Sequence, residues 1–507
     1  MSRELPPRGM SVTRQIILLG AVLNVSYLAT CIHKSSRVYL FQQAQCLNYY
    51  QANDPTKIDS HYQVDEALCK IHEVQSPLSI LDGIDSFLQN LPGLLVLATY
   101  KEFLPIVGAR SLIIVSVLFS CLGVLLSTII FWLHQPWAPY LALLSFLYEI
   151  VGGGEITRIA LTMMCIALIS PPTRLTEFYN YISAFWVLSS VGGSAIGSVL
   201  LSRHVWLLNA LSVLCFILAA CLATAIPSGL GRGGESAEDT TPIIMASDDP
   251  DIQRTSPERD SLHREESTKH SLIGILLHSW HASYLSMLQL FRLPNPTFTV
   301  IVVFLLNGLA IRIEVLLPQY ISLNLQWPLA MVNRILAFNS LVSSIVLFSL
   351  PTFRKVYLEP KMTTPQIDLF IVQAALTANM VGMVGFGFSS PALFFVLALC
   401  IYTAGSGVYD SLTAYGTLTL PPGEKVSEFY VHIGLINTLA ALVGAPMWSW
   451  IFSVVLRSGF LPLGLPFWVC AALFGAGISG ARLLKSWMAS GLDSRRYERV
   501  VSNAMGE

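Results

Sequence analysis

The sequence has few charged residues. Only 12% of its 507 residues are Asp, Glu, Lys or Arg, whereas 53% are hydrophobic. A soluble globular protein usually has about 25% charged residues. The mean hydropathy of +0.60 agrees with this imbalance. The composition therefore excludes an ordinary soluble protein and predicts a chain that lies mostly in a lipid bilayer.

Several functional signatures are also missing. The formal net charge is −1 and no basic stripe is present, so we expect no nucleic-acid partner. The sequence contains no Gly-x4-Gly-Lys-Ser/Thr loop, which argues against ATP hydrolysis by this chain. No Cys-x-x-Cys pair, metal-ligand set or nucleophile–base set stands out. We therefore expect no metal, no cofactor and no enzymatic activity.

Long apolar runs are what the sequence does contain. About 20 apolar residues cross the hydrocarbon as a helix, and open sheets cannot exist there. We predict an all-α membrane protein with twelve transmembrane helices in two bundles of six. The predicted helices span residues 15–32, 77–100, 110–134, 137–169, 176–201, 203–226, 296–323, 327–350, 366–388, 391–419, 426–455 and 460–485.

The remaining segments complete the predicted domain plan. Residues 227–270 are charged and contain Pro and Ser, which is typical of a disordered linker. Apolar residues recur at helical spacing over 271–292, which predicts an amphipathic helix on the membrane surface. The domains are a tail (1–14), an N-terminal bundle (15–226) with a polar loop (33–76), a linker (227–295), a C-terminal bundle (296–485) and a second tail (486–507).

One short pattern occurs twice. Residues 171–179 read Pro-Pro-Thr-Arg-Leu-Thr-Glu-Phe-Tyr, and residues 421–430 read Pro-Pro-Gly-Glu-Lys-Val-Ser-Glu-Phe-Tyr. The two copies are about half the chain apart, and each follows an apolar segment with a glycine cluster, at 152–154 and 405–407. A helix, a polar turn and a helix repeated once per half indicate a duplicated membrane bundle.

The distribution of Lys and Arg predicts the orientation. Cytosolic loops carry an excess of these residues, and the fit is best with both termini in the cytosol. As separate expectations, we predict a monomeric multi-pass protein and the plasma membrane as its location. The predicted inner loops contain Lys101, Arg110, Arg174, Arg354, Lys355, Lys361 and Lys425, whereas the short outer loops contain only Arg203 and Arg457.

This orientation puts the loop 33–76 outside the cell, where disulfides form. Cys46 and Cys69 lie in that loop, while the other seven cysteines are in or beside apolar segments. A bridge would close a loop of about 24 residues and stabilise the fold by roughly 3 kcal/mol on the loop-entropy model. Cys46 and Cys69 are therefore a disulfide candidate, with two free thiols as the alternative.

Several stretches carry a family resemblance. Cys-Leu-Asn-Tyr-Tyr at 46–50, Val-Asp-Glu-Ala-Leu-Cys-Lys at 64–70, Leu-Pro-Gly-Leu-Leu at 91–95, Gly-Gly-Gly at 152–154 and Pro-Gln-Tyr-Ile-Ser at 318–322 are the relevant ones. With the six-plus-six plan, they resemble the major facilitator superfamily, and within it a fungal branch with a long first extracellular loop. This resemblance implies a secondary active transporter that works by alternating access.

The signature between predicted helices 2 and 3 departs from the family pattern. Its place reads Lys-Glu-Phe-Leu-Pro-Ile-Val-Gly-Ala-Arg at 101–110, which keeps Gly108 and Arg110 but has Pro105 at the aspartate position. In the family that aspartate helps to latch the cytosolic side. Arg110, Glu155 and Arg158 are therefore candidates for gating. Glu155 and Arg158 lie three residues apart on one helix face, so an intrahelical ion pair is the alternative.

Polar residues inside apolar helices are the candidates for the transport pathway, because intramembrane charge is costly and usually faces a cavity or a partner. Glu149 lies near the middle of predicted helix 4 and is a candidate for proton exchange; a hydrogen bond to a neighbouring helix is the alternative. Asp85 and Gln89 belong to a polar stripe on predicted helix 2, whose outer member Asp82 we expect to be hydrated. The other candidates are Asn24, Asn307, Arg312, Tyr402 and Asn437.

The predicted function follows from the resemblance and from these weakly charged helix faces. Fungal relatives often export drug-like compounds or secondary metabolites, so we expect efflux of a small organic molecule, with proton coupling as one option. Uptake of a nutrient or small metabolite is the alternative within the transporter class. A non-transporting membrane sensor is the alternative outside that class, because of the altered signature at 101–110.

Overall fold

The computed structural model describes most of the chain as helix, and the described residues contain no strand. The predicted surface helix at 271–292 lies outside the described residues, as do the prolines of both repeated segments. The described residues are 12–59, 62–133, 138–169, 175–201, 204–230, 295–388, 391–418 and 426–489.

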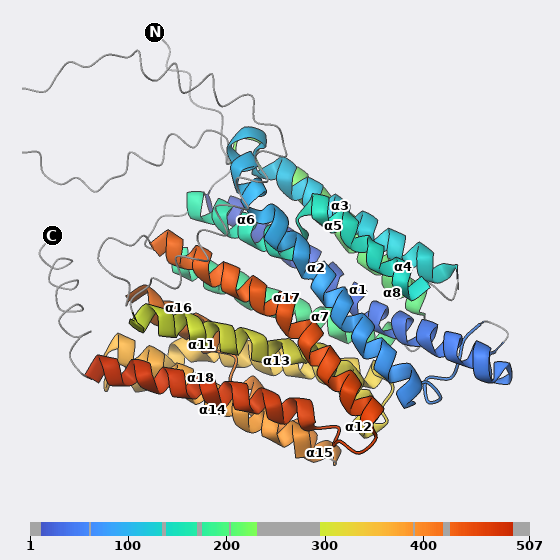
Figure 1. Cartoon of the computed structure of the whole chain (residues 1–507). Helices are drawn as coiled ribbons and strands as arrows, with labels where there is room; N and C mark the ends of the chain where they lie inside the picture. Colours follow the sequence, from blue (N-terminus) through green and yellow to red (C-terminus); the bar gives the residue numbers. More distant parts are fainter. Residues whose placement is uncertain are drawn as a thin grey trace, which may run out of the picture.

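The helices form two groups in chain order (Figure 1). The first group, here called the N-half, contains α1 (Val12–Asn53), α2 (His72–Val107), α3 (Ala109–Trp132), α4 (Ala138–Ala142), η2 (Leu143–Ser145), α5 (Phe146–Gly152), α6 (Gly154–Ile169), α7 (Leu175–Leu200) and α8 (Val205–Thr224). The second group, the C-half, contains α11 (Asn295–Ile311), η4 (Arg312–Leu316), α12 (Leu317–Leu325), α13 (Leu329–Phe353), η5 (Arg354–Leu358), α14 (Thr364–Phe388), α15 (Ala392–Thr403), α16 (Val408–Leu418), α17 (Val426–Ser458) and α18 (Leu465–Ala489).

The predicted class, an all-α membrane protein, is confirmed. Nine helical stretches of the described residues are long and apolar enough to cross a membrane. The other helices of the N-half are α2, α7 and the pieces from α4 to α6. They are consistent with the twelve predicted crossings. Predicted helix 4 is broken at Gly153, where φ is +76°, a value that glycine adopts without a steric penalty. Predicted helix 10 is divided between Thr403 and Val408, at its glycine cluster.

Helix α1 is the main correction to the predicted boundaries. We predicted that it ends at residue 32 and that a loop follows, but it continues to Asn53. No Gly or Pro occurs between residues 33 and 53, and Asp54-Pro55 then ends the helix. At 1.5 Å per residue the helix is about 63 Å long, twice the thickness of the hydrocarbon.

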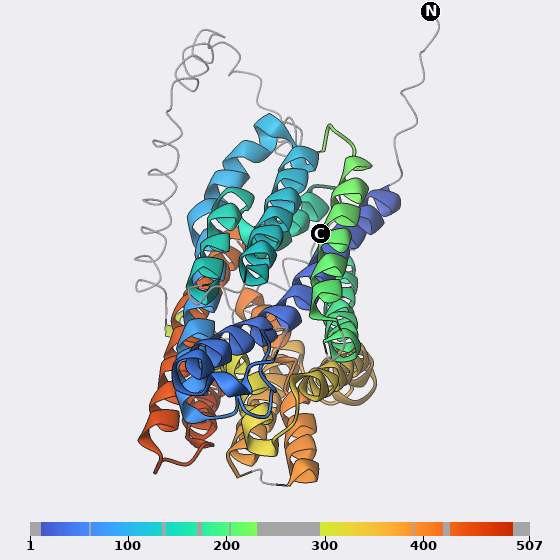
Figure 2. The same ribbon diagram turned by 90° about the vertical axis from the view of Figure 1, so that its right-hand side faces the viewer.

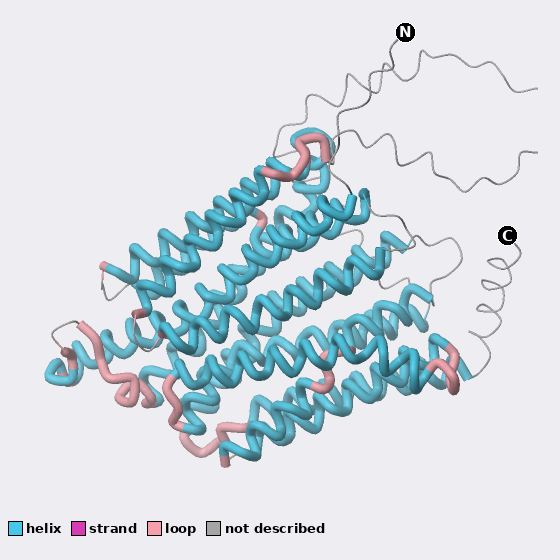
Figure 3. Tube along the Cα trace, turned by 180° about the vertical axis from the view of Figure 1, so that it is seen from behind, coloured by secondary structure: helices cyan, strands magenta, loops and turns pink. Residues whose placement is uncertain are grey.

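The rest of the predicted loop is short and folded. Cys46 on α1 forms a disulfide with Cys69, and both side chains are fully buried. Leu47, Val64 and Val74 are buried with them in a small apolar cluster. We call the end of the bundle at which this cluster lies the disulfide end. There α1 ends and α2 begins, and the pink loops of this end are visible in Figure 3.

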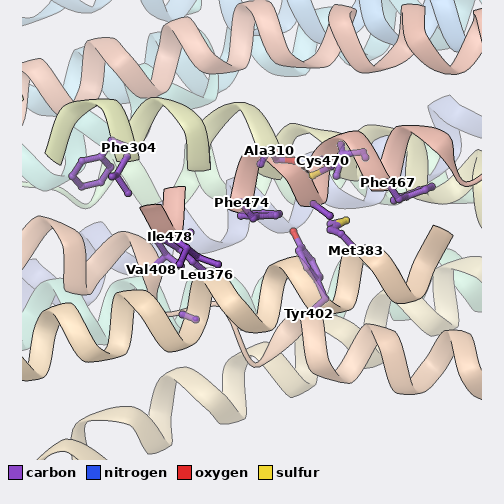
Figure 4. Packing of buried hydrophobic residues seen from close by; sticks show 14 of the residues in the cluster. Phe304, Ala310, Leu376, Met383, Tyr402, Val408, Phe467, Cys470, Phe474 and Ile478 are labelled. Atoms are coloured by element: carbon purple, nitrogen blue, oxygen red, sulfur yellow. Dashed lines mark hydrogen bonds between the residues drawn. The ribbon is translucent and has the colours of Figure 1, made fainter. Parts of the chain in front are cut away.

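Each half has its own apolar core. Figure 4 shows the core of the C-half, where side chains of α11, α14, α15 and α18 meet and the Cys470 thiol lies 3.3 Å from the carbonyl oxygen of Ala310. The core of the N-half is built from α1, α2, α3, α6, α7 and α8. A view turned by 90° shows the first residues of α1 among the helices of its own half (Figure 2).

Helices α2 and α17 join the two halves at the disulfide end. Their backbones approach closely at Gly83, where an added Cβ would lie 2.6 Å from Cβ of Ser449 and 3.2 Å from Cα of Pro446. The hydroxyls of Ser76 and Ser453 are 2.7 Å apart, and the Ser79 hydroxyl donates to the Ser449 carbonyl at 2.9 Å. Small residues therefore permit this contact, as they do between other membrane helices.

We predict that Gly83→Ala destabilises the contact between α2 and α17. The added methyl group overlaps Ser449 and the backbone of α17, and overpacking of this kind costs about 1–3 kcal/mol. Gly434→Ala is the matched control, because no atom lies within 4 Å of a Cβ at that position. The free energy of unfolding, measured by SDS titration in mixed micelles, should fall for Gly83→Ala only. Equal values for the two variants would contradict the close approach.

Candidate functional site

A cavity of about 260 Å³ lies between the two halves. Its N-half wall comes from α1, α2 and α7, and its C-half wall from η4, α12 and α13. Ser190 of α7 and Ser340 of α13 meet across it with their hydroxyl oxygens 3.1 Å apart. The charged residues of the lining are Lys34, Arg37, Asp82, Asp85 and Glu314.

Arg37 connects three segments of the N-half. Its guanidinium forms an ion pair with Asp85 of α2 and donates to the Ser145 hydroxyl at 3.2 Å and to the Ala142 carbonyl at 3.3 Å. It also lies 5.2 Å from the centre of the Phe41 ring. Burial of a charge in a membrane bundle requires such partners, so the pair fixes α1 against α2 and against the segment around η2.

Lys34 and Glu314 bring opposite charges to the same cavity from opposite halves. The Lys34 side chain is exposed to the cavity, one turn before Arg37 on α1. A carboxylate oxygen of Glu314 accepts a hydrogen bond of 2.8 Å from the Tyr402 hydroxyl. An organic molecule with polar groups at both ends would find a cation on one wall and a carboxylate on the other.

Asp82 differs from its expected environment. We predicted a hydrated residue at the outer mouth, but only 8% of Asp82 is exposed and it lines the cavity one turn from Asp85. Ser86, the next polar residue of the stripe, also lines the cavity, whereas Gln89 does not. The part of the stripe from Asp82 to Ser86 therefore faces the cavity, and Asp85 within it forms the ion pair with Arg37.

Glu149 lies in a second polar cluster, inside the N-half. The Ser120 hydroxyl donates to its carboxylate at 2.9 Å, and the Arg158 guanidinium donates to the same hydroxyl. Arg158 thus bonds to Ser120 of α3, and Glu155 lies three residues before it on α6. The guanidinium is also 5.9 Å from the centre of the Phe216 ring. The arrangement agrees with the alternative of a hydrogen bond to a neighbouring helix and leaves proton exchange as a prediction.

The remaining predicted residues do not line the cavity. Asn24 accepts from Ser189 of α7 at 3.2 Å. Asn307 is buried on α11, and its neighbour Gly308 faces Asn437 of α17. Arg312 is packed beside Gly444 of α17. Arg110 lies in the first turn of α3, at the end of the bundle opposite the disulfide.

Sequence reasoning missed Lys34, Arg37 and Glu314. The two cations were assigned to an outer loop because α1 was ended too early. A signal was present, because residues 27, 31, 34, 38 and 41 follow the alternating spacing of four and three that marks one helix face, and all five line the cavity. Glu314 was not among the predicted residues, but it belongs to the 3-10 turn η4 and lines the cavity.

Two bundles of membrane helices with a charged cavity between them define a membrane transporter of the two-domain type. The chain belongs to the Major Facilitator Superfamily, whose family model matches residues 102–445. The predicted family is therefore confirmed, and its fungal relatives agree with the predicted branch.

Two fungal relatives match over most of their length. The MFS efflux pump atnC of Emericella nidulans is 22% identical over 94% of this chain and 89% of its own. The MFS transporter SAT21 of Stachybotrys chartarum is 22% identical over 84% of this chain and 88% of its own.

Solved structures share the fold. The D-xylose-proton symporter superposes with a TM-score of 0.58 at 12% identity, covering 94% of this chain and 97% of its own. The human organic anion transporter MFSD10 has a TM-score of 0.56 at 15% identity, covering 93% of this chain and all of its own.

We predict that the Arg37–Asp85 ion pair is required for stability. Asp85→Asn leaves a buried guanidinium without its counter-charge, so the free energy of unfolding should fall by about 3–5 kcal/mol. Replacing both partners by apolar residues, in Arg37→Met with Asp85→Leu, should recover part of this loss. Thermal unfolding of the purified variants measures both effects, and a double variant less stable than Asp85→Asn would contradict the coupling.

Proposed function

We propose that the protein exports an amphipathic organic metabolite by secondary active transport. The cavity between the halves is the observation that carries this proposal, because its walls come from two bundles that could rock about a ligand held between them. The name of the relative atnC, an efflux pump, supports export. The predicted orientation places the disulfide end outside the cell. We propose the plasma membrane as the location of the protein.

The lining suits a ligand that is mostly apolar with a few polar groups. Side chains such as Val38, Phe41 and Leu336 alternate in the lining with serines and with the charged residues described above. Pockets for small organic molecules usually combine an apolar surface with a small number of placed polar groups. The cavity volume of about 260 Å³ suits a small metabolite rather than a peptide chain or a lipid.

We predict that filling the cavity blocks transport without unfolding the protein. Ser194 of α7 lines the cavity, so Ser194→Trp should occupy the space that a substrate needs. Val199 lies on the same helix with 58% of its surface exposed, so Val199→Trp adds the same side chain outside the cavity.

The assay uses proteoliposomes with an imposed pH gradient, a mixture of fungal secondary metabolites, and mass spectrometry of the vesicle contents. The unmodified protein and Val199→Trp should concentrate at least one compound, and Ser194→Trp should concentrate none. Equal accumulation in Ser194→Trp would show that the cavity is not the pathway. Accumulation only under a gradient of the opposite direction would favour uptake.

Proton coupling through Glu149 is a separate prediction. Glu149→Gln keeps a hydrogen-bond acceptor for Ser120 and removes the exchangeable proton. Gradient-driven accumulation should be lost, while exchange of labelled for unlabelled compound at equal pH persists, because exchange needs no net proton movement. Ser120→Ala is the control, because it removes the hydrogen bond to Glu149 and keeps the carboxyl group. Accumulation by Glu149→Gln with an unchanged dependence on pH would remove this residue from the coupling scheme.

A further inference from the structure

The segment between residues 62 and 71 reaches from the N-half to the C-half at the disulfide end. We propose that Glu66 and Lys70, held in place by the Cys46–Cys69 disulfide, form a latch that keeps this end closed by binding the turn between α12 and α13. The inference rests on the alternating-access cycle proposed above. It assigns to these residues the role of an outer gate in that cycle.

Glu66 caps a helix of the opposite half. One of its carboxylate oxygens accepts a hydrogen bond of 2.7 Å from the backbone N–H of Leu329, the first residue of α13. The first N–H groups of a helix have no partner within the helix, and Pro328 at the N-cap provides no side-chain acceptor. The acceptor that a helix usually takes from its own N-cap residue therefore comes here from the other half of the molecule.

Lys70 binds a second group of the same turn. Its ammonium donates to the Trp327 carbonyl at 2.9 Å, and this carbonyl also accepts from the Ser322 hydroxyl at 2.8 Å. Gln326, just before, has a φ of +56°, which turns the chain sharply between the two helices. Glu66 and Lys70 thus bind one N–H and one carbonyl of a single turn, which a rigid-body opening of the halves would pull away from both.

The latch is anchored firmly to the N-half. Cys69 lies between Glu66 and Lys70 in sequence and is bonded to Cys46 of α1. The Gln43 amide donates to the Val64 carbonyl at 3.1 Å, and the Gln75 amide donates to the Cys69 carbonyl at 2.9 Å. Because the segment is already ordered, closing the latch costs little conformational entropy. The latch and the α2–α17 contact both join the two halves at the disulfide end, so a rigid-body movement of the halves must open them together.

The chemistry of Glu66 suggests how it acts. Burial raises the pKa of the Glu66 carboxyl, against the opposing effects of the Leu329 N–H group and of the Lys70 charge. In the contact with Leu329 the side chain acts as a hydrogen-bond acceptor for a backbone N–H group. An amide in the same place should do the same work.

The experiment measures how often the disulfide end opens. Ser79 is fully buried against α17, so a Ser79→Cys reporter becomes accessible only when α2 and α17 separate. The background keeps Cys46 and Cys69 and replaces the seven free cysteines by alanine. The rate of labelling by a membrane-impermeant maleimide is measured on the full-length purified protein. Labelling in SDS and size-exclusion chromatography check that each variant carries the reporter and is folded.

Glu66→Ala and Lys70→Ala should each increase the labelling rate about fivefold, as expected for the loss of one helix cap or one charge-assisted hydrogen bond. Glu66→Gln should label at close to the parental rate. The matched controls are Glu73→Ala and Lys57→Ala, which remove exposed charges from the same region and should leave the rate unchanged.

Removal of the disulfide provides a further test of the latch. Cys46→Ser with Cys69→Ser should also increase the rate, and adding Glu66→Ala should then have less than its usual effect, because both changes disable one device. Parental rates in both Glu66→Ala and Lys70→Ala would overturn the latch. If those variants still transported, the proposed function would survive that result. A reporter that labels only in SDS, in every variant, would overturn the alternating movement and the latch together.

Discussion

Arg37 imposes the strongest constraint on this structure. Its charge is permanent, only 6% of the residue is exposed, and every segment that supplies a partner must therefore stay in place. Asp85 neutralises the charge, and Ser145 and the Ala142 carbonyl accept further hydrogen bonds. These partners turn the polar faces of α1, α2 and the η2 segment toward one another, which leaves Lys34 and Asp82 beside them at the cavity. The charged character of the N-half wall of the cavity thus follows from the way in which one cation is accommodated.

The contact between the halves has a different character from the cores within them. Each core is closely packed and apolar, as in the cluster of Phe386, Phe395 and Phe467. The halves, in contrast, meet partly through small polar groups: Ser76 with Ser453, Ser79 with Ser449, and Ser190 with Ser340. Apolar side chains also contribute, since Leu329 of α13 belongs to an apolar cluster of the N-half. Hydrogen bonds between membrane helices contribute only about 0.6–2 kcal/mol each. Such a contact can hold two units together and still let them separate, as the proposed alternating access requires.

The sequence predicted the helices well where apolar runs were long and bounded by Gly or Pro. The predicted 110–134 corresponds to Ala109–Trp132, and 366–388 corresponds to Thr364–Phe388. It failed at α1, because polar residues after position 32 suggest a loop when the partners that bury them are unknown. The same limit applies to the site. Asp85 was identified from its spacing on a polar helix face, but its partner Arg37 was placed outside the membrane.

The sequence by itself determined the membrane location, the two-bundle plan and the family, because these depend on composition, on run length and on local patterns that need no knowledge of distant contacts. Only the tertiary structure decided which polar residues share a cavity, that Lys34 and Glu314 line it from opposite halves, and that Glu66 caps a helix more than 260 positions later in the chain. The physical reason is that the cost of a buried charge or of an uncapped helix end is settled by whichever partner the fold brings near. No rule of local sequence specifies that partner.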